Sequence, residues 1–178
     1  MAHHDDLLTT AAASVARAPG QRGRLPAAVI RRSISTAYYA MFSFISHECG
    51  VKLVGSEGRL LVRRRMFARV LTHKGAKTAL GKIRGARIDE SLTPFFGVAV
   101  APDFARTFAQ VFADAQAKRH EADYDLNATL DEADALVLID RVRGAIAGWS
   151  GSATRDDRDF KHAICLLVVF KGKLKPDD

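Results

Sequence analysis

One apolar stripe between Pro26 and Gly50 constrains the fold more than any other feature of the chain. Its members recur at the three- and four-residue spacing of one helix face: Ile30, Ile34, Ala37, Tyr38, Met41, Phe42 and Ile45. Pro26 suits the first turn of a helix and Gly50 suits its end. We therefore predict a helix of roughly twenty residues, about 30 Å long, with Tyr38 buried and Tyr39 at a contact between helices.

Similar patterns in the rest of the chain predict further helices, at residues 7–18, 60–71, 73–83, 102–119, 133–149 and 160–170. The stretches 19–25, 51–58 and 85–101 read as loops. Thr72 suits the cap of the short helix that follows it. Thr129 with Glu132 matches a capping box, and Asp156 or Asp157 suits the start of the last helix.

These segments predict an all-α protein, an up-and-down helical bundle of four or more main helices with short helices and a C-terminal helix. We expect residues 1–178 to form one domain, with an N-terminal helix and loop (1–24) and a C-terminal helical extension (156–178). No apolar run is long enough to predict a membrane span, and the N-terminus lacks a secretory pattern. Cys49 and Cys165 have no CxxC spacing, which favours free, buried thiols and a cytoplasmic location.

Positive charge is concentrated in one segment. Ten basic residues and no acidic ones lie between Gly58 and Ile88, so the rest of the chain carries a net charge of −3 against +7 for the whole. We predict a basic face over residues 59–87 that binds the phosphates of RNA or a nucleotide, chiefly through Arg63, Arg64, Arg65, Arg69, Lys74 and Lys77. An acidic protein partner and a merely solvated face are the alternatives.

Residues 118–125, KRHEADYD, hold a dense set of acid–base side chains. Continuing the preceding apolar face by seven residues from Phe112 reaches Arg119, so Arg119 is predicted to point inward and His120 to lie off that face. A half-buried arginine requires an acceptor. Asp123 and Tyr124 provide one, which predicts a structural clasp that ends the helix. A phosphate site, or a catalytic site of Arg119, His120 and Tyr124, is the alternative.

Two segments together resemble the HEPN domain: RRSISTAYYAMF (31–42) and RHEADYD (119–125). More narrowly, the chain is similar to uncharacterised bacterial HEPN-like proteins with an AYYAxF helix and an RxxADYD turn. His73 has a counterpart in that group, and DRDFKHAICLLVVF resembles a C-terminal extension found in some members. The resemblance spans residues 25–170. It implies a helical bundle, often a homodimer, that binds or cleaves RNA in toxin–antitoxin, phage-defence or RNA-processing systems.

The resemblance also implies where a catalytic histidine should stand. Ribonucleases of that family carry an Arg followed, after four to six residues, by a His, which serve metal-independent cleavage. After Arg119 those positions hold Tyr124, Asp125 and Leu126. Arg155 and His162 have the spacing but fall in another segment.

No nucleotide-loop, hydrolase or zinc-protease motif is present, and the histidines are scattered, so we predict no cofactor and no metal. The first hypothesis is a binding module for RNA or a nucleotide. The alternatives are a metal-independent ribonuclease toxin and a protein-interaction module with an acidic partner such as an antitoxin.

Overall fold

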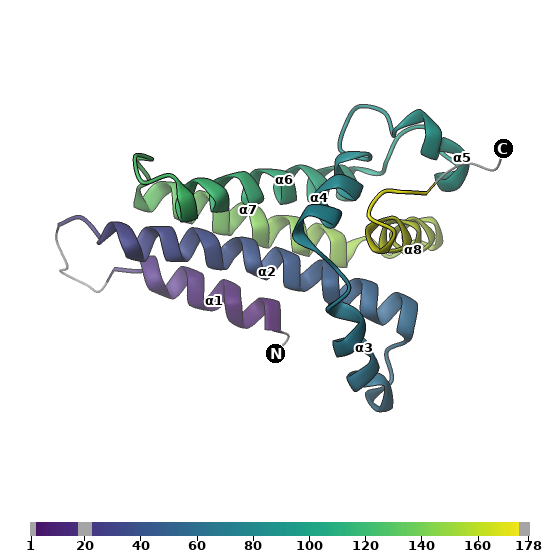
Figure 1. Ribbon diagram of the computed structural model, residues 1–178, viewed down its shortest axis with the longest axis horizontal. Helices are drawn as coiled ribbons and strands as arrows, with labels where there is room; N and C mark the ends of the chain where they lie inside the picture. Colours follow the sequence, from purple (N-terminus) through teal and green to yellow (C-terminus); the bar gives the residue numbers. More distant parts are fainter. Residues whose placement is uncertain (1–2, 18–22, 175–178) are drawn as a thin grey trace.

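The computed structural model describes residues 3–17 and 23–174 (Figure 1). Four helices run alternately in opposite directions as neighbours: α1 (His3–Val15), α2 (Ala27–Val54), α6 (Asp103–Tyr124) and α7 (Glu132–Gly151). A further helix, α8 (Arg155–Val169), packs at the end of the bundle against α2. Over the described ranges there is no strand. The predicted all-α bundle is confirmed.

Short elements connect α2 to α6. They are η1 (Gly58–Leu60), α3 (Leu61–Ala68), α4 (His73–Gly81), η2 (Glu90–Leu92) and α5 (Thr93–Phe96). Helix α4 packs on α6 and α8, whereas α3 projects from the bundle (Figure 1). None of the helices described here is long and apolar enough to cross a membrane. The predicted N-terminal loop and the predicted C-terminal extension fall partly on residues 18–22 and 175–178, which lie outside the described residues.

The apolar stripe of α2 forms the centre of the core. Tyr38 is fully buried, as are Phe108 and Phe112 of α6 and Trp149 of α7. The Trp149 indole Nε1 donates to Glu48 Oε2 at 2.9 Å, so its one polar group is satisfied. Because α2 contacts α1, α6, α7 and α8, burial of this single stripe organises the whole fold.

Helix boundaries differ from prediction at two places. Helix α2 runs past Gly50 and ends at Gly55, where φ is 116° and glycine is favoured. A Cβ at Gly50 would lie 3.5 Å from the Arg64 Cβ, so this residue marks a close approach of α3 and not a helix end. Helix α1 begins at His3, and the predicted start at Leu7 was too late. His4 is buried against the Phe44 ring, with 5.0 Å between ring centroids.

Two of the three capping predictions were displaced along the chain. Asp131 caps α7 in a capping box with Asp134, and the predicted pair of Thr129 with Glu132 does not form one. Thr154 caps α8, with Asp157 as its partner three residues on. Thr72 does cap α4, accepting from the Gly75 amide as predicted.

The apolar residues of α7 do not all point inward. Leu136 and Val137 are exposed, whereas Ala135 and Leu138 are buried. Helix α7 is covered by α1, α2 and α6 and its remaining side faces solvent. Only the packed arrangement decides which of two adjacent apolar positions lies inside.

Candidate functional site

Arg119, near the end of α6, points toward α2 and its side chain is only 18% exposed. Its Cζ lies 5.9 Å from the ring centroid of Tyr38, 5.6 Å from that of Tyr39 and 5.5 Å from that of Tyr124. Its Nη2 donates long hydrogen bonds of 3.4 Å to the hydroxyls of Tyr39 and Tyr124. All three tyrosines of the chain therefore surround one guanidinium, an arrangement that stabilises a cation.

Asp123 holds this guanidinium from the same helix. Its Oδ2 lies 2.5 Å from Arg119 Nε, and its Oδ1 accepts from the Ser35 hydroxyl of α2. The structure therefore brings together the three residues predicted to form a clasp. Tyr124 takes part in the clasp from the surface, because the residue is 63% exposed. Five residues after Arg119, it lies about 140° around the helix from the buried face.

His73, the first residue of α4, completes the cluster from a third element. Its Nδ1 lies 2.7 Å from the Tyr38 hydroxyl, and its ring packs on Phe42 with 3.9 Å between centroids. Burial lowers the pKa of His73, and the nearby Arg119 guanidinium lowers that pKa further. The imidazole is therefore neutral near pH 7, within the electrostatic reach of a fixed cation.

The other histidine candidates do not contact Arg119 or His73 in the described structure. His120 is exposed, and its ring packs on Tyr124 with 4.9 Å between centroids. Arg155 and His162 are exposed on α8, at the far end of the bundle from the end of α6 (Figure 1). The spacing match between them does not place a histidine near Arg119.

Arg31 ties the end of α6 to the start of α2. Its two terminal nitrogens donate to four backbone carbonyls, those of Glu121, Ala122, Asp125 and Ala128, at 3.4, 2.9, 2.8 and 2.9 Å. The carbonyls of Glu121 and Ala122 belong to the last turn of α6, and those of Asp125 and Ala128 belong to the loop that follows it. Arg31, and not only the Arg119 clasp, therefore fixes this end of the bundle.

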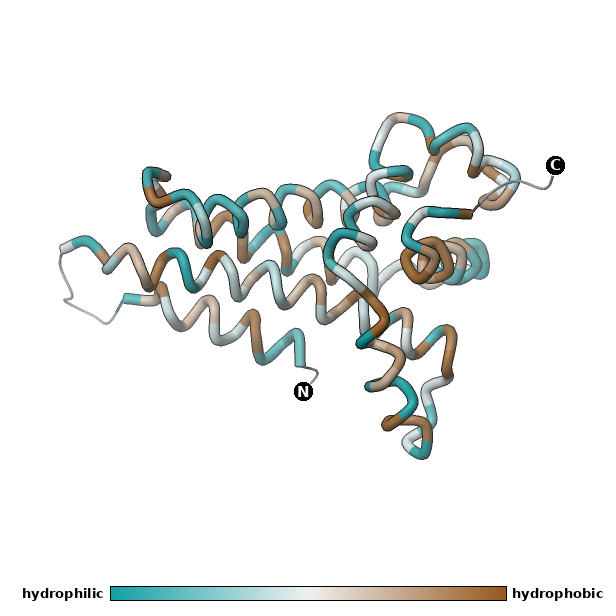
Figure 2. Tube along the Cα trace, viewed as in Figure 1, coloured by the Kyte–Doolittle hydropathy of each residue, from teal (hydrophilic) through white to brown (hydrophobic). Residues whose placement is uncertain are grey.

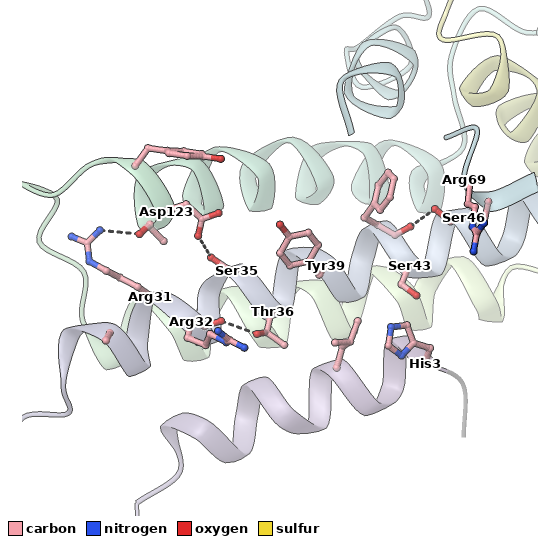
Figure 3. Close-up of a pocket in the computed structure, with 16 residues that line it drawn as sticks. His3, Arg31, Arg32, Ser35, Thr36, Tyr39, Ser43, Ser46, Arg69 and Asp123 are labelled. Atoms are coloured by element: carbon pink, nitrogen blue, oxygen red, sulfur yellow. Dashed lines mark hydrogen bonds between the residues drawn. The ribbon is translucent and has the colours of Figure 1, made fainter. Parts of the chain in front are cut away.

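A groove of about 1070 Å³ runs along α2 beside the cluster (Figure 3). Its walls come from the start of α1, the end of α6 and the end of α3. The floor is a polar stripe of α2: Arg32, Ser35, Thr36, Tyr39, Ser43 and Ser46. Figure 3 shows Arg32 and Arg69 toward opposite ends, with Tyr39 between them. The three- and four-residue spacing of this second stripe is a sequence signal that could have predicted the groove.

Two arginines of the groove are available for a ligand. Arg32 and Arg69 are exposed, and neither side chain has an ion pair or hydrogen bond within the part of the chain that the structure describes. A phosphate placed near either one would meet an uncompensated guanidinium.

The predicted basic segment divides among several surfaces. Arg63 and Arg65 are exposed on α3, and Lys74 and Lys77 are exposed on α4, all without an ion-pair partner among the described residues. Arg65 is one turn before Arg69 and shares its side of α3, whereas Arg63 lies on the other side. The cations therefore surround α3 and continue onto α4, with Arg69 leading into the groove.

Arg64 has a different place from its neighbours. Its Nη1 donates to the carbonyls of Gly55 at 2.7 Å and Glu57 at 2.9 Å, and its aliphatic part packs on Gly50. This guanidinium stabilises the turn after α2. We therefore exclude it from the free cations of the segment.

Helix α3 also exposes apolar side chains. Val62, Met66 and Val70 are exposed, and Met66 is 64% exposed. Figure 2 shows apolar segments on the projecting part of the molecule. No residue of α3 is buried. Its apolar side is therefore available to a partner, while its cations are available to phosphates.

The described residues contain no group of three or more His, Cys, Asp or Glu side chains placed to hold a metal ion. No family model, curated protein or solved structure matches this chain.

Proposed function

We propose that this protein binds RNA along the groove of α2 and the cations of α3 and α4. The observation that carries the proposal is the pair of unpartnered arginines, Arg32 and Arg69, at opposite ends of a groove floored by hydroxyl groups. Guanidinium groups bind phosphate oxygens through paired N–H donors, and hydroxyls add further donors along the backbone. The HEPN-like sequence resemblance and a cytoplasmic location agree with this role.

Exposed rings in the groove favour a single strand over a duplex. Tyr39 lies on the groove floor and Tyr124 on its wall, both exposed. Unpaired bases stack on such rings, whereas the bases of a duplex are already stacked on each other. The Arg119 guanidinium, which is paired with Asp123, donates to both hydroxyls and so holds the two rings beside the groove.

Fluorescence anisotropy with a labelled single-stranded RNA tests this proposal. We expect the double variant Arg32→Gln/Arg69→Gln to bind at least tenfold more weakly. Its plot of log K against log salt should be shallower by about 1.4, because each lost phosphate contact removes about 0.7. The double variant Arg143→Gln/Arg155→Gln, which removes two exposed arginines of α7 and α8, is the matched control.

Equal RNA affinity in the two double variants would overturn the proposal. A wild-type protein that binds no RNA and co-purifies with an acidic protein would favour the interaction module instead. The exposed apolar side of α3 would then be the first surface to examine, including for a homodimer.

A second candidate function is metal-independent RNA cleavage, and the contact between His73 and Tyr38 beside Arg119 favours it. Burial raises the pKa of Tyr38, so its hydroxyl stays protonated and donates to Nδ1 of the neutral ring. The ring proton then resides on Nε2, where it can donate a hydrogen bond to a phosphate oxygen as negative charge develops there. Arg119 supplies the positive charge that stabilises a phosphorane.

Incubation of the pure protein with labelled RNA in EDTA tests this second function. We expect cleavage that is lost in Arg119→Ala and His73→Ala and retained in His120→Ala, since His120 is exposed and contacts the Tyr124 ring but neither Arg119 nor His73 in the described structure. Intact RNA with the wild-type protein would leave binding as the function.

A further inference from the structure

A second cavity, of about 610 Å³, lies between α6, α7 and the turn that follows α4. It shares no lining residue with the groove of α2. Ligand sites for small molecules commonly occupy about 300–1,000 Å³. The cavity is therefore large enough for a small ligand and independent of the proposed RNA surface.

Three arginines from three separate segments line this cavity: Arg84 from the turn, Arg106 from α6 and Arg141 from α7. Arg84 is exposed and has no ion-pair partner in the described ranges. Arg106 pairs with Asp103 and Arg141 with Asp114, each through one Nη2 at 2.5 Å. No carboxylate is among the lining residues themselves. The lining therefore holds three cations and no anion, and two of these cations are paired with carboxylates that lie outside the lining.

These ion pairs leave most of the donors unused. A guanidinium has five N–H donors, and each carboxylate here engages one terminal nitrogen. The Nε of Arg106 is buried and has no acceptor among the described residues. Three guanidinium groups with two carboxylates leave an excess of positive charge. An anion with several oxygens would compensate this excess positive charge and occupy the remaining donors.

The rest of the wall consists of small and apolar residues. Gly144 and Ala145 of α7 face Val111 of α6 across the cavity lining. A Cβ built on Gly144 would meet no atom within 4 Å, so the space beside it is empty. An apolar part of a ligand can contact this wall while its charged part meets the arginines.

We propose that this cavity binds a small phosphorylated molecule of nucleotide size through Arg84, Arg106 and Arg141. A phosphoryl group presents three oxygens in a tetrahedral arrangement, which suits guanidinium groups that approach from separate elements. A compact diphosphate satisfies more of these donors than a single carboxylate does. This site does not depend on RNA binding in the groove of α2.

Isothermal titration with inorganic pyrophosphate and with ADP, at constant ionic strength, tests the proposal on the full chain. We expect both probes to bind the wild type, and both Gly144→Leu and Arg84→Gln to bind at least tenfold more weakly. Gly148→Leu is the matched control, because Gly148 lies one turn further along α7, outside the cavity, and is also open to an added side chain. We expect its affinities to equal those of the wild type.

Leucine favours a helix more than glycine does, and both variants replace a glycine in the interior of α7. The midpoint temperature of thermal unfolding should therefore not fall below that of the wild type in either variant. Wild-type protein that binds neither probe at millimolar concentration would overturn the proposal, as would equal affinity in Gly144→Leu and Gly148→Leu. An RNA oligonucleotide that displaces ADP from the wild type, and whose own affinity falls in Gly144→Leu, would show that RNA phosphates occupy the cavity and would overturn the small-molecule assignment. These titrations test the cavity independently of the RNA proposal, because RNA binding is tested with the double variant Arg32→Gln/Arg69→Gln.

Discussion

The hydroxyl of Tyr38 lies 2.7 Å from Nδ1 of His73 and joins the core of α2 to the first residue of α4. Burial raises the pKa of Tyr38 and lowers the pKa of His73, and Arg119 lowers the pKa of His73 further. The native contact is therefore between a protonated hydroxyl and a neutral imidazole. Protonation of the ring would remove the acceptor and place a second cation beside Arg119.

Stability should fall in mild acid because of this contact. The folded pKa of His73 lies below its unfolded value of about 6.5, so below that pH the unfolded chain binds more protons. We expect the free energy of unfolding to decrease from pH 7.5 to pH 5, and to decrease less in His73→Gln. His4, whose pKa is also lowered by burial, accounts for a remaining decrease. Urea unfolding across this range measures both slopes, and identical slopes would contradict the role of His73.

Removal of Arg31 should destabilise the end of the bundle. Its guanidinium satisfies carbonyls of α6 and of the following loop, including those of Ala122 and Ala128. We expect Arg31→Ala to lower the free energy of unfolding by about 2–3 kcal/mol. The neighbouring Arg32→Ala should stay within about 0.5 kcal/mol of the wild type, since Arg32 is exposed and unpartnered within the described structure. Denaturant unfolding of the two variants provides the comparison, and equal stability would show that the carbonyls find other partners.

Lys161 of α8 is buried, and substitutions of it measure how much its charge contributes to the free energy of unfolding. Its ammonium donates to the Ser152 carbonyl and lies 5.3 Å from the ring centroid of Phe104 and 5.8 Å from that of Trp149. Burial lowers its pKa. We expect Lys161→Met to stay within about 1 kcal/mol of the wild type, because the apolar contacts persist. Lys161→Ala should lose about 2 kcal/mol through the cavity it leaves. A thermal melt that ranks methionine below alanine would indicate that the charge dominates.

The two thiols should be unreactive in the native protein. Cys49 and Cys165 are free and buried, and the Cys49 Sγ lies 3.9 Å from the Cys165 carbonyl oxygen. The neighbouring Cys49 thiol and burial raise the pKa of Cys165, which disfavours the reactive thiolate. Ellman's reagent should react with the two thiols at least a hundredfold faster in the denatured protein, in roughly 8 M urea, than in the native protein. Rapid native labelling of one thiol would show that the contact between α2 and α8 opens.

Part of the candidate site followed from helical phase alone. Arg119 was predicted to point inward because it continues the face of Phe112, and its ion pair with Asp123 needs only the four-residue spacing of a helix. Its contacts with Tyr39, Tyr38 and His73 depend on α2 and α4, and no local pattern encodes which elements meet. Those contacts required the packed bundle.

The charge of the basic segment shows the same division. The sequence determined that ten cations lie together without acids, a property of composition. The sequence did not determine what each of these cations contacts. Arg64 binds backbone carbonyls, Arg69 lines the groove of α2, and Arg84 lines the cavity beside α7.

By itself the sequence determined an all-α bundle built on the stripe from Ile30 to Ile45, since the spacing of apolar residues sets which helix face is buried. Only the tertiary structure decided where helices stop, as at Gly55, and which polar face of α2 stays open. The reason is physical. Burial periodicity is local in the chain, whereas a groove exists only where neighbouring helices leave one face of α2 uncovered.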